Sequence, residues 1–426
     1  MADYRRLQVA TIVERLNEPP ERLLAIFGPR QSGKTWAVRQ ALASIPQRSR
    51  IVPVDAPDED VESNPIGFSN AAGTTGGYVR LATASRDVQW LVDIWEEARY
   101  QARSSDRGFV LALDEIQRVQ GWAAAVKGLW DADRASGCPL HVVMLGSAPL
   151  LMQAGLNESL MGRFEPIDFV HWSFDEMADA FEFDLDEYVY FGGYPGAASF
   201  VSDHQRWHRY VRSSLVEPSI ERDVIDMTRV DKPELLRQVF DVAARHSGRM
   251  LSYTQMLGLL EDAGNTTTVT RYLDLLHQVG LVTGLPAYSE SAVSRASSPK
   301  LNVLNTGLMS MASGYTFHQA RVDRTLWHYL VESAVGAHLL NSSSPGTNVA
   351  YWRGRRRRSV VEVSFVVERG PHRVGIDVAS EAEHEALPGL DEFADRFDAR
   401  TLVVGEGGVP LDEFLSASAS EWIEEA

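Results

Sequence analysis

One segment near the N-terminus has the residue types and spacing of a loop that binds phosphates. It reads Gly28-Pro29-Arg30-Gln31-Ser32-Gly33-Lys34-Thr35 and fits the pattern Gly-x-x-x-x-Gly-Lys-[Ser/Thr]. Glycine at both ends permits backbone conformations and close contacts that a Cβ would block. We expect the amides of residues 30–35 to surround the phosphates of ATP, Lys34 to reach the β and γ oxygens, and the Thr35 hydroxyl to ligate Mg²⁺. The segment therefore predicts a Mg-ATP site. The alternative is a glycine-rich turn that binds no nucleotide.

Two carboxylates follow an apolar run later in the chain. The run Phe109–Leu113 ends in Asp114 and Glu115. In a parallel sheet, this end of the strand lies at the same edge as the phosphate-binding loop. We predict that Asp114 holds the Mg²⁺ and that Glu115 activates the attacking water as a general base. The alternative is an ordinary strand end.

Two further residues are candidates for contact with the γ-phosphate. Ser147 follows the apolar run His141–Leu145, and a polar residue at such a strand tip is a candidate sensor of the γ-phosphate or the water. Arg163, in Leu160-Met161-Gly162-Arg163-Phe164, is predicted to reach a phosphate of its own chain or of a neighbouring copy. The alternatives are a strand-to-loop serine and a surface or salt-bridged arginine.

Short apolar runs alternate with helical stretches through residues 1–170. This alternation predicts an α/β domain whose parallel sheet is covered by helices on both faces. The expected strands are Leu23–Phe27, Ile51–Asp55, Phe109–Leu113, His141–Leu145 and Pro166–Val170. The expected helices include Trp36–Ser44, Val88–Ala102 and Trp122–Arg134. The stretch Ser63–Tyr78 is rich in Gly, Ser, Asn and Thr, which predicts a mobile loop.

The rest of the chain divides into three expected parts. Residues 171–230 are expected to form a helical lid or connector. Residues 231–290 predict a winged-helix-like domain, in which three helices precede one side of a β-hairpin at residues 281–285. These helices are expected at Glu234–Arg245, Ser252–Asp262 and Thr267–Val279. In residues 291–426 strands return at Val360–Val367 and Arg373–Val378, with a helical stretch near Leu411–Glu425.

These motifs, in this order, resemble the AAA-type ATPases of bacteria and archaea that carry a domain of unknown function after the P-loop domain. Beyond the phosphate-binding loop, the resemblance rests on Leu113-Asp114-Glu115-Ile116-Gln117, Gly121-Trp122, Gly146-Ser147, Leu160-Met161-Gly162-Arg163-Phe164, Phe191-Gly192-Gly193-Tyr194-Pro195, Glu221-Arg222-Asp223-Val224, Ser298-Pro299-Lys300 and Asn305-Thr306-Gly307-Leu308. It covers nearly the whole chain. It implies an AAA-type P-loop core, a winged-helix-like middle and a C-terminal α/β domain related to PD-(D/E)xK nucleases.

The C-terminal part departs from the pattern that the resemblance implies. Relatives often have an acid at the position of Ser364 and a lysine at the position of Ala379, whereas Glu362 and Asp377 keep their carboxylates. Asn305 stands where relatives often have Asp. Metal-dependent cleavage of phosphodiesters needs carboxylates for Mg²⁺ and a cation near the nucleophile. We therefore expect a degenerate nuclease-like domain without nuclease activity.

A basic cluster offers a second class of function. Arg353 and Arg355-Arg356-Arg357-Arg358 lie beside Tyr351 and Trp352, which suggests contacts with phosphates and stacking of the two rings on bases. Arg271 is the cation near the start of the expected recognition helix. The alternatives are a solvated hairpin turn and a surface that binds protein.

Composition limits these alternatives. The chain of 426 residues has a formal net charge of −17, which argues against broad affinity for nucleic acid. It has one cysteine and therefore no internal disulfide, and it shows neither a signal-peptide core nor a membrane-spanning run, so a cytoplasmic location is expected. We predict an ATP-hydrolysing switch or remodelling ATPase that acts on a macromolecular partner, with a homo-oligomer left open. The alternative is a nucleic-acid-binding regulator or defence-type protein in which ATP gates the winged helix.

Overall fold

The structure of this protein is a computed structural model. It describes the ranges 4–54, 86–146, 160–226, 228–261, 264–289, 298–356, 359–379 and 388–424. The chain forms two compact units, one of Asp3–Phe169 and the other mainly of Val170–Ala426. Each unit is described by itself below. No helix in these ranges is long and apolar enough to cross a membrane.

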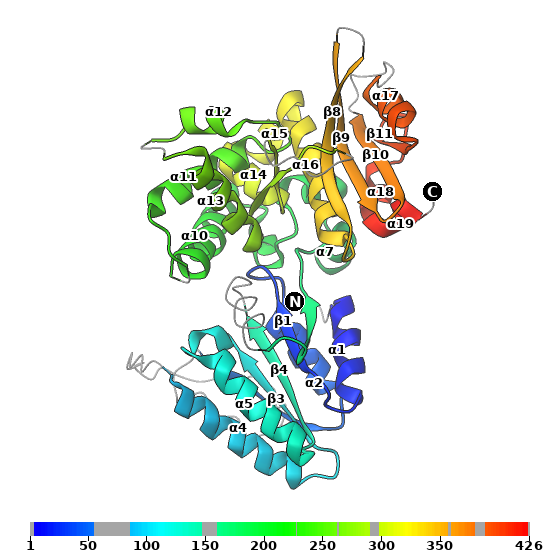
Figure 1. The fold of residues 1–426 in the computed structure, drawn as a ribbon. Helices are drawn as coiled ribbons and strands as arrows, with labels where there is room; N and C mark the ends of the chain where they lie inside the picture. The colour runs from blue at the N-terminus through cyan, green and yellow to red at the C-terminus, as the bar shows by residue number, and fades with distance from the viewer. Residues whose placement is uncertain are drawn as a thin grey trace. The chain divides into compact units, whose positions relative to one another are not determined.

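The N-terminal unit is built on a five-stranded parallel sheet in the order β2-β3-β4-β1-β5 (Figure 1). Parallel pairing follows from the alternation of buried strands with helices, because each helix returns the chain to the same edge of the sheet. The strands are β1 (Leu23–Phe27), β2 (Arg48–Pro53), β3 (Phe109–Asp114), β4 (Leu140–Gly146) and β5 (Phe164–Asp168).

Helices cover both faces of this sheet. On one face, Trp95 and Trp130 from two helices pack against the sheet residue Leu111. On the other, Ile12 and Val38 pack in a second core. The helices are α1 (Leu7–Asn17) and α2 (Lys34–Ala43) on this second face, and α4 (Val88–Arg103) and α5 (Trp122–Ser136) on the first.

Two strands of this sheet begin or end at other residues than the sequence predicts. The strand expected at Ile51–Asp55 begins earlier, at Arg48, because it pairs with β3 from Phe109 onward. It lies at the edge of the sheet, where Arg48 is exposed to solvent and Ser49 and Arg50 are half-buried. The last strand ends at Asp168 instead of Val170. The loop expected at Ser63–Tyr78 lies outside the described residues.

The C-terminal unit begins with helices. Those before residue 226 are α7 (Phe174–Phe181), α8 (Leu185–Phe191), η2 (Pro195–Phe200), α9 (His204–Tyr210), η3 (Val211–Val216), α10 (Glu217–Ile220) and η4 (Glu221–Ile225). Three helices then precede an antiparallel strand pair, as expected: α11 (Pro233–Arg245), α12 (Tyr253–Gly258), α13 (Thr266–Gln278), β6 (Val282–Leu285) and β7 (Lys300–Val303). The middle helix is shorter than expected. It starts in a capping box at Ser252 and ends at Gly258.

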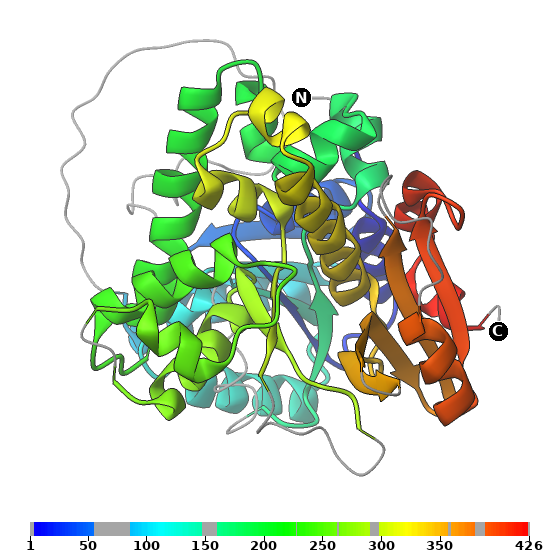
Figure 2. The same cartoon turned by 90° about the horizontal axis from the view of Figure 1, so that it is seen from above.

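Three helices connect β7 to a four-stranded sheet in the order β11-β10-β9-β8 (Figure 2). The helices are α14 (Thr306–Ser313), α15 (Phe317–Val322) and α16 (Arg324–Ser342). The strands are β8 (Asn348–Arg356), β9 (Ser359–Arg369), β10 (His372–Ala379) and β11 (Arg400–Gly405). β8, β9 and β10 pair antiparallel, and β11 is parallel to β10.

Both faces of this sheet are buried. On one face, α17 (Pro388–Phe397) brings Phe393 against Trp352 and Val363. On the other face, α16, α18 (Leu411–Ser416) and α19 (Ala419–Glu424) surround Phe365. The single helical stretch expected near Leu411–Glu425 is therefore two helices. They are separated at Ala417, which is extended and whose carbonyl accepts a hydrogen bond from His338.

A β-bulge interrupts the β8–β9 pair. Ala350 pairs with Val366, but Trp352 pairs with Val363. Ser364 and Phe365 therefore both lie opposite Tyr351. Such a bulge changes the direction in which nearby side chains point. In this sheet it lies where strand β9 contributes Ser364 to a charged pocket.

Candidate functional site

The predicted phosphate-binding loop joins β1 to α2, and its two glycines are required by its geometry. Gly28 has φ 154°, and a Cβ there would lie 1.9 Å from the carbonyl oxygen of Phe169. Gly33 has φ 89° and is the N-cap of α2. Any side chain at Gly28 would clash with backbone, so the loop passes this point only with glycine.

The ammonium of Lys34 lies within the loop. Its Nζ donates hydrogen bonds to the carbonyl oxygens of Gly28 at 2.9 Å and Pro29 at 2.8 Å. The side chain is buried, and the Ser32 hydroxyl donates to the same Pro29 carbonyl at 2.9 Å. A cation buried among neutral carbonyls interacts strongly with the oxygens of a triphosphate.

The two predicted Mg²⁺ ligands meet although they are far apart in the sequence. The Thr35 hydroxyl donates a hydrogen bond of 2.8 Å to Oδ2 of Asp114. The contact arises because Thr35 lies in the first turn of α2, which follows β1 and the loop, and Asp114 ends β3, which is separated from β1 only by β4. A hydroxyl and a carboxylate are hard oxygen ligands of the kind that Mg²⁺ binds, so these residues fit the ion.

Glu115 has an unusual backbone. Its φ of 61° and ψ of 39° are left-handed, a conformation that costs energy for a non-glycine residue and concentrates at functional sites. Its carboxylate accepts a hydrogen bond from the amide of Gln117, which is buried in the 3₁₀ turn η1 (Ile116–Arg118). The hydrogen bond therefore holds the Glu115 carboxylate against the turn that follows β3.

The sequence reasoning missed Arg6. Its guanidinium is buried, donates a hydrogen bond of 2.7 Å to the carbonyl oxygen of Ser32, and lies over the ring of Phe169 at 5.5 Å from the centroid. It supports the phosphate-binding loop from outside its motif. The one signal in the sequence was a pair of arginines before an amphipathic helix, a common arrangement that predicts no particular contact.

Two further residues of this unit, Ser147 and Arg163, were predicted to contact the γ-phosphate. Ser147 lies outside the described residues. Arg163 is not brought to the phosphate-binding loop of its own chain. It directly precedes β5, whose first residue, Phe164, pairs with Leu23 at the start of β1, whereas the loop follows the other end of β1. Its guanidinium instead forms an ion pair with Asp131 at 2.7 Å. The alternative of a phosphate contact in the same chain is therefore wrong, and contact with a neighbouring copy stays a prediction.

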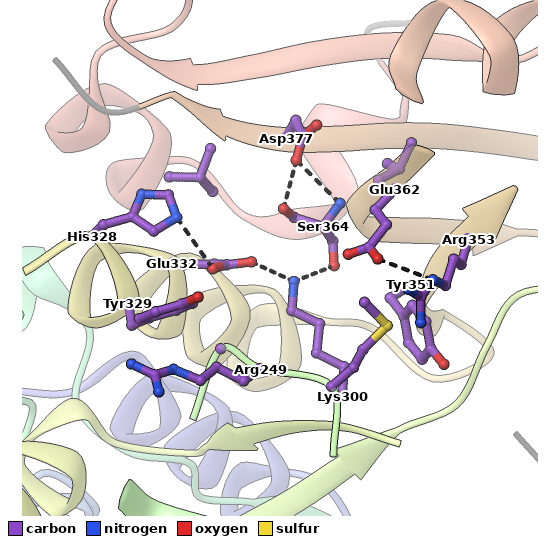
Figure 3. A pocket seen from close by; sticks show the side chains of 14 residues that line it. Arg249, Lys300, His328, Tyr329, Glu332, Tyr351, Arg353, Glu362, Ser364 and Asp377 are labelled. Atoms are coloured by element: carbon purple, nitrogen blue, oxygen red, sulfur yellow. Dashed lines mark hydrogen bonds and ion pairs between the residues drawn. The ribbon is translucent and has the colours of Figure 1, made fainter. Parts of the chain in front are cut away.

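A second concentration of charged groups lines a pocket of about 660 Å³ in the C-terminal unit (Figure 3). Lys300 from β7 forms a buried ion pair with Glu332 from α16, and its Nζ also donates to the carbonyl oxygen of Ser364 at 3.0 Å. The Ser364 hydroxyl and amide both donate to Oδ1 of Asp377, at 2.5 and 3.2 Å. Burial raises the pKa of Asp377, while the hydrogen bonds from Ser364 and the Lys300 charge oppose the shift.

The pocket brings together Glu362, Ser364 and Asp377 from the predicted nuclease-like segments. Lys300 and Glu332 were missed as site residues. Lys300 appeared only as part of the resemblance, and Glu332 is a single acid within an apolar part of its helix. Within the described ranges, no group of three or more His, Cys, Asp or Glu side chains is placed to hold a metal ion.

The basic cluster differs from its expected form. Tyr351 and Trp352 are each only 3% exposed, so neither ring is available to stack on a base, and this part of the prediction is wrong. Both are buried because helices cover both faces of their sheet. Arg353 pairs with Glu362 and Arg356 with Asp391. Two members, Arg357 and Arg358, lie outside the described residues.

Arg271 also has a partner within its own unit. Its guanidinium donates a hydrogen bond of 2.7 Å to the backbone carbonyl oxygen of Arg229. Asn305 caps the N-terminus of α14 through a bond from Gly307 N to its Oδ1 at 3.1 Å.

Two segments of the chain match known family models. Residues 20–178 match the model of the AAA domain family. This segment is an AAA-type P-loop domain. The AAA domain is followed by residues 182–319, which match a domain of unknown function (DUF8612). No curated protein matches the chain.

The three solved structures compared with the chain are at most 14% identical to it, and their TM-scores lie below 0.5. The Walker-type ATPase of Pyrococcus abyssi is 14% identical, with a TM-score of 0.45 over 73% of this chain and 96% of that one. The Aeropyrum pernix ORC1 protein in complex with DNA is 13% identical, with a TM-score of 0.27 over 74% and 92%. The Thermotoga maritima RuvB Holliday junction branch migration motor is 14% identical, with a TM-score of 0.30 over 65% and 89%.

The buried ion pair of the C-terminal unit leads to a prediction for stability. The side chains of Lys300 and Glu332 are 5% and 7% exposed. We expect Lys300→Met to lower the free energy of unfolding of this unit by about 3–5 kcal/mol, because it leaves the Glu332 charge buried without its counterion. The double variant Lys300→Met/Glu332→Leu is expected to recover most of that loss. Chemical denaturation measures both, and a single variant as stable as the wild type would contradict the ion pair.

Proposed function

We propose that this protein hydrolyses Mg-ATP in its AAA domain and uses the turnover as a molecular switch. The observation that supports this most is the contact between Thr35 and Asp114, next to the Lys34 ammonium. These three side chains come from two segments that the sheet brings together, and their chemistry suits a triphosphate with a bound divalent ion. A glycine-rich turn without a ligand would not need this set of residues.

Each residue has a distinct role in the proposed reaction. Thr35 and Asp114 would hold Mg²⁺, which neutralises charge on the phosphate oxygens when it is bound. Lys34 binds the β and γ oxygens, and the amides of residues 30–35 orient the phosphates. Glu115 accepts a proton from the water as its oxygen bonds to the γ-phosphorus. The bond from that phosphorus to the β–γ bridging oxygen breaks, and ADP and inorganic phosphate leave.

The second part of the proposal concerns the C-terminal unit, residues 170–426. We infer that its helical, winged-helix-like and nuclease-like parts bind a macromolecular partner and do not cut nucleic acid. The absence of an acid at Ser364 and of a lysine at Ala379 supports this view, as does the engagement of Lys300 by Glu332. Cleavage of DNA or RNA with Mg²⁺ or Mn²⁺ that is lost in Asp377→Ala would contradict it.

A comparison of two nucleotide states tests the switch. Glu115→Gln held in Mg-ATP should keep the ATP state and its partner or oligomer, whereas Lys34→Ala should lack both. Sedimentation and affinity capture from cell extract, run on both variants, are expected to differ. Identical sedimentation and identical bound proteins would contradict a nucleotide-dependent switch. DNA retention that weakens with salt would instead favour the nucleic-acid-binding regulator.

A further inference from the structure

The amide side chain of Gln117 has an unusual hydrogen-bonding pattern for a buried group. It is 6% exposed, and its Nε2 donates to Oε2 of the Glu115 carboxylate. Its Oε1 is buried and accepts no hydrogen bond from the described residues. If the two ends of the amide were exchanged, its oxygen would lie against the carboxylate, so the N–H side must face Glu115. Within the described ranges, the bond to Glu115 is therefore the one hydrogen bond of this side chain.

This pattern is unfavourable for stability, which argues against a purely structural role for Gln117. A buried oxygen without a partner has lost its hydrogen bonds to water, and that loss destabilises the folded chain. An apolar side chain of similar volume would fill the same space without this cost. What the amide adds is the bond to Glu115, the residue with a left-handed backbone directly after β3.

The turn that carries Gln117 is held by the core of its unit. In η1 the amide of Arg118 donates to the carbonyl oxygen of Glu115, and the amide of Val119 donates to that of Ile116, both at 3.0 Å. The side chains of Ile116 and Val119 are fully buried in the core on the face of the sheet covered by α4 and α5. Because the core fixes the turn, the Gln117 amide has a fixed position relative to β3, and so has the carboxylate bonded to it.

We propose that Gln117 is a positioning residue, which orients the Glu115 carboxylate toward the attacking water. The inference rests on the proposed ATPase function, in which Glu115 takes the proton of that water. A general base works only within hydrogen-bond distance of the proton that it takes, and a glutamate side chain that nothing holds has many other conformations. A carboxylate accepts about four hydrogen bonds, so the bond from Gln117 orients Glu115 and leaves capacity for the water. A base that is itself oriented by a third group is a common arrangement for activating a nucleophile.

Single-turnover hydrolysis of Mg-ATP by the full chain tests the proposal. The variant is Gln117→Met, which keeps a similar volume but has no N–H to donate. We expect it to hydrolyse ATP about 10–100-fold more slowly than the wild type, because the carboxylate is no longer oriented. Its affinity for Mg-ATP should stay within about twofold, since the residue contacts no part of the phosphate-binding loop. Its thermal unfolding temperature should be no lower than that of the wild type, because the unpaired oxygen is removed together with the bond.

The same substitution in the Glu115→Gln background separates orientation from a general effect on the fold. There it should change the remaining rate by less than about twofold, because the group that Gln117 orients can no longer take a proton. Slowing by the same factor in both backgrounds would show that Gln117 acts independently of Glu115, and the proposal would be wrong.

Gln47→Met is the matched control. The Gln47 amide also donates one hydrogen bond, to the carbonyl oxygen of Leu16 at 3.0 Å, and its Oε1 is also buried without a partner among the described residues. It directly precedes β2, whose first residue pairs with the first residue of β3, whereas Glu115 follows the other end of β3. Gln47→Met should therefore leave the rate of hydrolysis within about twofold of the wild type.

The outcomes distinguish this inference from the proposed function on which it rests. Hydrolysis by Gln117→Met at or above the wild-type rate, while Glu115→Gln is slow, would overturn the inference and leave the ATPase assignment in place. Equal slowing by Gln117→Met and Gln47→Met, or a loss of ATP affinity as large as the loss of rate, would also overturn it. A wild type that does not hydrolyse ATP would contradict both the proposed function and the role of Gln117.

Discussion

Replacing Lys34 by alanine is expected to abolish measurable binding of Mg-ATP while the fold is retained. The Lys34 ammonium is buried within the loop and donates to the carbonyl oxygens of Gly28 and Pro29 and, at a longer distance, to the Ser32 hydroxyl. The substitution shortens this side chain to a methyl group. It removes the cation aimed at the phosphates, and the loss of two charge-assisted hydrogen bonds lowers affinity at least about 100-fold. Isothermal titration calorimetry measures the change.

Arg39→Ala is the matched control for this prediction. Arg39 lies further along the same helix, is exposed, and carries the same charge, but it faces away from the loop contacts described above. Its loss should leave ATP affinity within about twofold of the wild type, as is usual for an exposed residue outside a site. Equal affinities of wild type and Lys34→Ala would refute the assignment of the loop.

Glu115→Gln is expected to slow ATP hydrolysis by about 10²–10⁴-fold while Mg-ATP still binds. Glutamine has nearly the same shape but cannot take the proton of the attacking water. Binding persists because Thr35 and Asp114, which meet at 2.8 Å, remain to hold the Mg²⁺. Steady-state release of phosphate measures the rate, and calorimetry measures the binding.

Glu21→Gln is the corresponding control. Glu21 is exposed just before β1, at the edge of the sheet opposite the phosphate-binding loop. Its replacement should leave the hydrolysis rate unchanged. Hydrolysis by Glu115→Gln at the wild-type rate would show that another residue is the base.

The contact between Thr35 and Asp114 was predictable because the loop motif is local and the geometry of a parallel sheet follows a rule. The loop motif lies within eight residues, and parallel strands bring Asp114 to the same edge as Thr35 wherever the intervening strands lie. By contrast, Lys300 and Glu332 are 32 residues apart and meet only because β7 packs beside α16. No periodicity in either segment indicates that contact.

The prediction that the rings of Tyr351 and Trp352 stack on bases is wrong because helices cover both faces of their sheet. Tyr351 and Trp352 are adjacent in a strand and therefore point to opposite faces of the sheet. Their position beside several arginines suggested an exposed hairpin, but helices cover both faces at this point. The position of Arg163 could have been predicted, because a residue just before the expected parallel strand Pro166–Val170 lies at the end of the sheet opposite the phosphate-binding loop.

The most direct test of the ATPase assignment is the Mg²⁺-dependent release of phosphate from ATP by the full chain in a single-turnover assay. We expect the wild type to bind ATP and release phosphate only with Mg²⁺. Glu115→Gln should bind ATP and retain it unhydrolysed, and Lys34→Ala should do neither. Phosphate release that continues in Lys34→Ala, or a wild type that binds no ATP in the presence of Mg²⁺, would contradict an ATPase site at residues 28–35.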